Sequence, residues 1–234
     1  NFQKYRKQLL YRWFATMIIC PSDFAKVDLK IYFNNSKGIK VVNPMRDRFE
    51  EKKNTNPDFI EISYLGRLEP SKGVIDLIIG FVEYKIKRRD SRIILNIAGS
   101  GSQYIQIEEL CKKHTDINFL GSLCYSKIDD YLRKSHYAII PSKFDNLPTV
   151  GLEAMMNKTP ILISENTGLS SELRDGIECF KFSPTVEGII SLFNKVEDCI
   201  FNYEAMSIMA RKIFLDKFGI ENYTHKIKKI IENN

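Results

Sequence analysis

The chain has 234 residues, of which 44% are hydrophobic and 12% aromatic, so it is long enough to bury one large core or one and a half ordinary ones. It has no run of about 18 apolar residues and no secretory signal pattern, and we expect neither a spanning helix nor an exported protein. The net charge of +6 is modest, and we expect no nucleic-acid partner. Because the first residue is Asn and not Met, we expect a fragment.

The cysteines and histidines are scattered without the spacing of a metal site. The five cysteines form no C-x-x-C pair, which favours reduced thiols in a cytoplasmic protein (Cys20, Cys111, Cys124, Cys179 and Cys199). The three histidines show no ligand spacing either, so the sequence predicts no structural metal (His114, His136 and His225).

Basic residues gather in three stretches, Lys4–Arg12, Lys85–Arg92 and Lys226–Lys229. We favour solvated helix faces for most of them. The alternative is a surface that meets anionic lipid headgroups, which would place the protein peripherally on the inner face of a membrane.

The first part of the chain reads as two strands and two helices followed by a polar stretch. The apolar runs and caps predict helices over residues 3–14 and 23–32, and strands over residues 16–20 and 39–42. Residues 46–58 are polar and uneven, as is typical of a linker.

From residue 59 onward, strands alternate with helices. The predicted strands are residues 59–65, 92–98, 117–120, 136–140, 160–164 and 180–182. The predicted helices are residues 74–88, 103–114, 126–134, 169–174, 185–197, 203–216 and 220–231, with another that begins near Pro148. This alternation predicts an α/β fold with a Rossmann-like, doubly wound parallel sheet, whose ligands bind at the carboxyl ends of the strands.

Two cations follow the strand that ends at residue 65. Arg67 leaves the carboxyl end of that strand, and Lys72 lies at the start of the next helix, within the stretch Gly66–Gly73. An Arg guanidinium offers a planar fork of donors and a Lys ammonium a compact charge, so both can bind one diphosphate. The alternative is two surface charges on a loop.

Two acids bracket a second junction, in the stretch Pro141–Ala154 (PSKFDNLPTVGLEA). Asp145 lies in the loop, and Glu153 lies in the helix that follows, in an acid-x7-acid arrangement. The N-terminus of that helix would attract anions. The alternative is a capped helix with two solvated acids.

These two stretches, in this order, resemble the G-R-x-x-x-x-K-G and acid-x7-acid motifs of retaining glycosyltransferases of the GT-B fold, family 4. Asp145 stands where the family usually has Glu. The resemblance covers residues 16–232. It implies the end of an acceptor-binding domain over residues 1–45, a linker over 46–58, a nucleotide-sugar donor-binding domain over 59–216 and a C-terminal helix over 217–234.

The resemblance also implies roles for individual residues. Arg67, Lys72 and Asp145 would be catalytic, the two cations on the diphosphate and the acid on the transferred sugar. The implied donor-binding residues are Gly66, Gly99, Ser122, Leu123, Asn146, Leu147, Thr149, Val150 and Glu153. Glu153 would accept hydrogen bonds from the ribose hydroxyls, and Ser122 and Leu123 would lie by the base.

Three of these matches leave alternatives open. Gly99 begins the stretch Gly99-Ser-Gly101, directly after a predicted strand. It either contacts the ligand or only makes a tight turn. Gly121-Ser-Leu123 could equally be a plain strand-to-helix turn. Glu172 matches a family acid, but the usual G-G-x-x-E reads G-L-S-S-E here, and a helix-surface acid is the alternative.

We therefore predict the donor-binding half of a glycosyltransferase that uses a UDP- or GDP-linked sugar without a metal or other cofactor. Its acceptor would be a saccharide or a lipid-linked saccharide in bacterial capsule, exopolysaccharide or lipopolysaccharide synthesis. One alternative is a non-catalytic nucleotide-sugar-binding module. Another is an NAD-dependent oxidoreductase. Tyr104 argues against it, because it occupies the position of the third glycine of a dinucleotide fingerprint.

Overall fold

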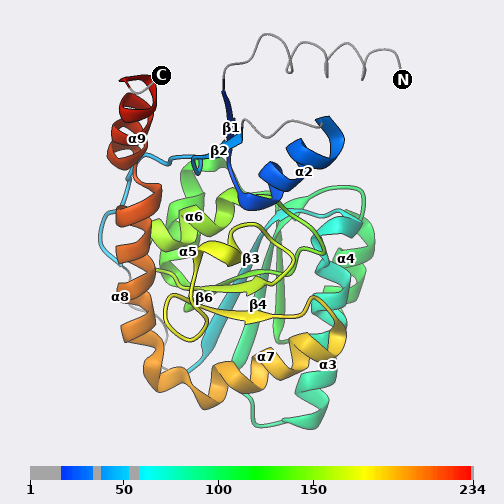
Figure 1. The fold of residues 1–234 in the computed structure, drawn as a ribbon. Coiled ribbons are helices and arrows are strands. Elements are labelled where there is room, and N and C mark those ends of the chain that lie inside the picture. Colours follow the sequence, from blue (N-terminus) through cyan, green and yellow to red (C-terminus); the bar gives the residue numbers. More distant parts are fainter. Residues whose placement is uncertain (1–16, 34–37, 53–57, 233–234) are drawn as a thin grey trace.

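The computed structural model describes residues 17–33, 38–52 and 58–232 (Figure 1). The helix predicted over residues 3–14 lies outside them. The described chain begins with β1 (Ile18–Cys20), α2 (Asp23–Phe33) and β2 (Gly38–Lys40), and the two strands pair in parallel. This first unit therefore has the strand–helix–strand order predicted from the sequence, although its second strand ends two residues early, at Lys40.

Among the described residues, the main sheet has six parallel strands in the order β5-β4-β3-β6-β7-β8. They are β3 (Ile60–Arg67), β4 (Ile93–Ser100), β5 (Ile117–Gly121), β6 (Tyr137–Ile140), β7 (Ile161–Ser164) and β8 (Cys179–Phe182). The order runs outward from β3 to one edge and then returns to β6 on the other side of β3. The predicted Rossmann-like, doubly wound sheet is confirmed, with its reversal between β3 and β6.

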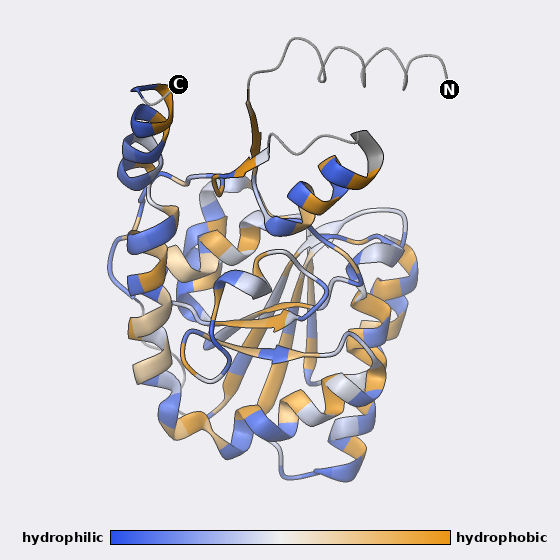
Figure 2. Cartoon of the chain, viewed as in Figure 1, coloured by the Kyte–Doolittle hydropathy of each residue, from blue (hydrophilic) through white to orange (hydrophobic). Residues whose placement is uncertain are grey.

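Helices cover both faces of this sheet, as Figures 1 and 2 show, with apolar strands at the centre and polar residues on the outer helix faces. The helices are α3 (Val74–Lys87), α4 (Tyr104–Cys111), α5 (Ile128–Lys134), α6 (Thr149–Met156), α7 (Val186–Asp198), α8 (Tyr203–Ile213) and α9 (Ile220–Glu232). One buried cluster includes Phe81 of α3 and Phe193 of α7, and a second includes Leu152 of α6 and Ala210 of α8. Among the described helices, none combines the length and apolar character that a membrane span requires.

Several predicted boundaries were wrong. The helix expected over residues 169–174 is a single 3-10 turn (Ser170–Glu172), and the one expected over 203–216 ends at Ile213 and continues as a π-helical turn (Phe214–Phe218). Strands β3 and β4 each run two residues further than predicted, because Gly66 pairs with Gly99. A Cβ on Gly99 would lie 1.9 Å from the Gly66 carbonyl oxygen, so glycine there permits the longer ladder.

Gly73 fixes the start of α3 beside the loop that follows β6. Its φ is +69°, in the left-handed region, and a Cβ there would lie 2.3 Å from the carbonyl oxygen of Pro141. Pro141 opens the loop that carries Asp145, and Gly73 directly follows Lys72. The absence of a side chain at Gly73 therefore brings the two motif-bearing loops into contact.

We expect Gly73→Ala to cost more stability than the same change at Gly176, where φ is +76° but a Cβ would meet nothing within 4 Å. Both variants incur about 1 kcal/mol for the positive φ, and Gly73→Ala adds about 2 kcal/mol for the overlap with Pro141. Urea unfolding of both variants measures the difference. Equal losses would show that the Pro141 loop moves away freely.

Stability should also depend on pH through His136, which is buried just before β6. Its Nδ1 accepts a hydrogen bond from the Glu61 N–H at 3.1 Å. Burial, with the positive charges of Lys52 and Arg92, lowers the pKa of His136 to about 4. Because the unfolded chain takes up this proton near pH 6.5, the contribution is complete above that pH and is lost as the pH falls toward 4.

We therefore expect the stability gap between the wild type and His136→Asn, which keeps an acceptor near Nδ1, to narrow by about 3 kcal/mol from pH 7 to pH 4. Chemical unfolding at several pH values measures this gap. The matched control is His225→Asn on the exposed side of α9. A constant gap for His136→Asn would contradict the assignment.

Candidate functional site

A cavity of about 200 Å³ opens at the carboxyl ends of β3 and β6, where the strand order reverses. Doubly wound sheets bind their ligands at this position. The lining residues come from both strand ends, the 3-10 turn Pro70–Lys72 and the start of α6. They are Tyr64, Leu65, Gly66, Arg67, Lys72, Ile139, Ile140, Ser142, Asp145, Pro148, Thr149 and Val150. The cavity therefore joins the two stretches that the sequence singled out.

Lys72 and Asp145 form an ion pair across this cavity, and each side chain is less than one-fifth exposed. Arg67 lies at the end of β3 with an exposed side chain. The partly buried position limits the screening of the Lys72–Asp145 pair by water. The arrangement holds one cation in place inside the cavity and a second at its rim, which suits an anionic ligand.

Backbone contacts hold the two loops together around the ion pair. The Lys143 N–H donates to the Ser71 carbonyl oxygen at 2.9 Å, and the Lys143 ammonium pairs with Asp76 at 2.7 Å. On the other side, the Gly168 N–H donates to the Asp145 carbonyl oxygen at 2.9 Å. The loop that carries Asp145 is thus fixed to the start of α3 and to the turn after β7.

Asn146 and Gly168 meet at that turn. A Cβ on Gly168 would lie 2.1 Å from the Asn146 carbonyl oxygen, so this glycine permits a close backbone approach. The side-chain Oδ1 of Asn146 is buried and has no hydrogen-bond partner within the described part of the chain. Buried acceptors are normally paired. Asn146 therefore offers an acceptor beside Asp145 for a hydroxyl or a water.

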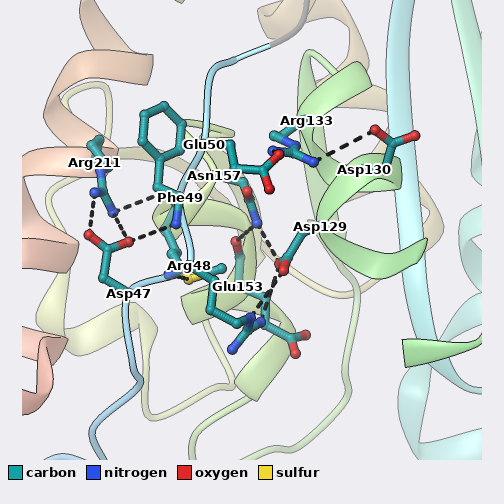
Figure 3. Close-up of polar contacts among 11 residues, drawn as sticks. Asp47, Arg48, Phe49, Glu50, Asp129, Asp130, Arg133, Glu153, Asn157 and Arg211 are labelled. Atoms are coloured by element: carbon teal, nitrogen blue, oxygen red, sulfur yellow. Dashed lines mark hydrogen bonds and ion pairs between the residues drawn. The ribbon is translucent and has the colours of Figure 1, made fainter. Parts of the chain in front are cut away.

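Glu153 lies one helical turn after Thr149 and Val150, on the same side of α6, but it does not line the cavity around Lys72. Its neighbours are Arg48 and Asp129, as Figure 3 shows. Burial raises the pKa of Glu153, the charge of Arg48 opposes the rise, and the charge of Asp129 adds to it. Glu153 therefore marks a second part of the site, beyond the cavity.

The structure brings together six of the predicted site residues in the cavity lining: Gly66, Arg67, Lys72, Asp145, Thr149 and Val150. Leu147 instead packs partly buried against the cluster that contains Leu152. Gly99 lies inside β4, where it pairs with Gly66 of β3, so it is a strand residue and the expected tight turn does not begin there. Its contact with a ligand stays a prediction.

Ser122 and Leu123 lie apart from the cavity. Ser122 is exposed after β5, and Leu123 lines a separate depression with Tyr131 and Lys127 of the neighbouring α5 region. They remain candidates for the base, because Tyr125, two residues after Leu123, lies beside Arg48, and Arg48 in turn lies beside Glu153.

Glu172 does not lie on a solvated helix surface, which was the alternative to its match with a family acid. It is almost buried in the 3-10 turn Ser170–Glu172, and its carboxylate pairs with Lys40 at 2.7 Å and with Lys217 at 3.5 Å. Lys40 belongs to β2 of the first unit. Glu172 therefore connects the first unit to the main sheet, and is not a solvated acid on a helix surface.

Sequence reasoning missed Arg48 and Asp129, which surround Glu153, and Ser142 and Tyr64, which line the cavity. Arg48 stands in a polar stretch with no motif, so no local pattern indicates its contact. Within the described ranges, no group of three or more His, Cys, Asp or Glu side chains is placed to hold a metal ion.

Solved structures share this fold. The Anabaena protein Alr3699/HepE in complex with UDP superimposes with a TM-score of 0.84 at 15% identity, over 100% of this chain and 68% of that one. At this identity the likeness shows the fold, which is that of GT-B glycosyltransferases.

Sequence relatives are glycosyltransferases as well. Glycogen synthase of Mycobacterium tuberculosis H37Rv is 30% identical over 59% of this chain and 34% of its own length. Lipopolysaccharide 1,2-N-acetylglucosaminetransferase of Salmonella typhimurium LT2 is 22% identical over 80% of this chain and 52% of its own length. The chain thus spans about a third to a half of these two relatives.

The family described as glycosyl transferases group 1 matches residues 45–213, which include both motif-bearing loops, the cavity and Glu153. The match confirms the resemblance drawn from the two motifs. The chain belongs to the glycosyl transferases group 1 family.

Proposed function

We propose that this chain is the donor-binding part of a retaining glycosyltransferase that transfers a hexose-type sugar from a nucleoside-diphosphate sugar. The observation that carries the proposal is the convergence of Arg67, Lys72 and Asp145 on one cavity at the sheet reversal. Two further findings support it. One solved structure of the same fold holds UDP, and one relative is a lipopolysaccharide N-acetylglucosaminyltransferase.

In this proposal the two cations act on the leaving group. When the bond between the sugar and the diphosphate breaks, negative charge grows on the diphosphate. Lys72 inside the cavity and Arg67 at its rim stabilise that charge, and Asp145 already orients Lys72 when the reaction begins. Fixed cations can take the part that a metal ion plays elsewhere, so we propose transfer without a metal.

Asp145 has two tasks in this scheme. Its ion pair with Lys72 orients the ammonium group before the donor arrives. Its remaining lone pairs accept hydrogen bonds from hydroxyls of the transferred sugar. Backbone N–H groups at Thr149 and Val150, at the start of α6, contribute partial positive charge on the phosphate side.

The nucleoside lies further along the same edge of the sheet. Glu153 accepts hydrogen bonds from the ribose hydroxyls, and backbone groups at Ser122 and Leu123 meet the base. UDP and GDP are the candidate nucleotides. The relatives are longer than this chain and leave room for a second lobe, which would bind the saccharide or lipid-linked acceptor. The transfer would belong to surface polysaccharide synthesis, in the cytoplasm or at the inner face of the membrane.

We expect Lys72→Met to weaken the binding of the cognate UDP- or GDP-sugar about tenfold, because a charge-assisted contact to phosphate is lost. Isothermal titration calorimetry measures the affinity. The matched control is Lys228→Met, an exposed lysine of α9 that does not line the cavity, which should change the affinity less than about twofold. No heat from the wild type with UDP-, GDP- or ADP-sugars would overturn the proposal.

In the full-length protein, Arg67→Ala should lower kcat about 100-fold with a smaller effect on KM, because the charge that it stabilises appears in the transition state. Steady-state assays with the cognate donor and acceptor measure both constants. Donor binding with no transfer by the wild type would favour the non-catalytic binding module. Transfer unchanged by Arg67→Ala would exclude the role of this residue.

A further inference from the structure

Residues 46–52, between the first unit and the main sheet, follow the surface of the main unit with no helix or strand. Ion pairs attach this segment at three places (Figure 3). Asp47 pairs with Arg211 of α8 and Glu50 with Arg133 of α5, both through exposed acids. The third attachment is the ion pair of Arg48 with Asp129, and it differs because both of these residues lie beside Glu153.

Arg48 bridges two parts of the main unit. Its Nε lies 3.0 Å from Asp129 Oδ2 and its Nη2 lies 3.2 Å from Asp129 Oδ1, a bidentate pair. Its guanidinium lies over the Tyr125 ring, 5.3 Å from the centroid. Both charged side chains are less than one-third exposed, and Asp129, at 22%, is less exposed than Asp47, at 37%, or Glu50, at 77%.

Asp129 and Glu153 are two carboxylates beside this one guanidinium, as the view in Figure 3 shows. Asn157, fully buried one turn after Glu153, donates its Nδ2 to Asp129 Oδ1 at 2.9 Å and to the Glu153 carbonyl oxygen at 2.9 Å. Asp129 is thus tied to the helix that carries Glu153. Without Arg48, the two acids would repel each other across a half-buried space.

We propose that Arg48 is a positioning residue for the nucleoside: it compensates the charge of Asp129 and holds the Glu153 carboxylate in place to accept hydrogen bonds from the ribose hydroxyls. This inference rests on the proposed function, which assigns Glu153 to the ribose. Arg48 itself touches neither ribose nor base. Its contact with Tyr125, two residues after Leu123, ties the same guanidinium to the segment assigned to the base.

The position of Arg48 in the chain has a consequence for the whole site. Arg48 lies outside the alternating strands and helices that build the sheet, in the segment that follows the first unit. The ribose contact is complete only when this segment is seated on α5 and α6. Donor affinity is therefore coupled to the placement of the segment that joins the two units.

The test is a thermodynamic cycle with two probes, UDP and 2′,3′-dideoxy-UDP, titrated into the full chain by calorimetry; guanosine nucleotides replace them if the wild type binds GDP instead. Arg48→Gln should weaken the binding of UDP about tenfold and leave the binding of dideoxy-UDP unchanged, because the dideoxy probe makes no ribose-hydroxyl contact. The control is Asp198→Asn, an exposed acid of α7 that pairs with Arg88 and has no contact with the segment, and it should leave both affinities unchanged. Circular dichroism confirms that each variant is folded.

A second variant separates charge compensation from simple loss of packing. Arg48→Gln combined with Asp129→Asn removes the repelling acid, and it should restore most of the UDP affinity. Equal losses for UDP and dideoxy-UDP, no loss for either, or no recovery in the double variant would each overturn the role of Arg48 while the proposed function stands. A wild type that binds neither UDP nor GDP would overturn both.

Discussion

The parallel pairing of β3 with β4 on one side and with β6 on the other is the constraint on which the site depends. It is a topological reversal, since β4 follows β3 directly and β6 returns after two further crossovers. The reversal leaves a gap between the loops that follow β3 and β6. Arg67 and Lys72 come from one loop and Asp145 from the other, so charges about 70 residues apart in sequence meet in one cavity.

Close backbone approaches hold that gap at a fixed width. Gly73 meets the Pro141 carbonyl, Gly99 meets the Gly66 carbonyl and Gly168 meets the Asn146 carbonyl. Two of these contacts join loops and the third joins the ends of β3 and β4, and each leaves no room for a Cβ. The glycines therefore act mainly on the placement of the charged side chains. This explains why a motif can carry glycines that need not touch the ligand.

The charged side chains beyond the cavity form a second layer of organisation. Glu172 forms an ion pair with Lys40 of the first unit, and Asp129 forms one with Arg48 of the following segment. These pairs join parts of the chain that are distant in sequence, and they place the first unit and its connection against the loops of the main sheet. The proposed coupling between donor binding and the placement of the two units therefore depends on these ion pairs.

The sequence by itself determined the α/β class, the alternation of strands and helices, and the two motif-bearing junctions, because hydrophobic periodicity and short-range capping are local properties. It did not determine the length of β3 and β4, or that residues 169–174 form a single 3-10 turn in place of a helix, since both depend on contacts with distant parts of the chain. Nor could it find Arg48 beside Glu153 or Lys40 beside Glu172: a salt bridge between remote positions has no local pattern. Only the tertiary structure decided those contacts, because folding alone sets which distant side chains share a half-buried space.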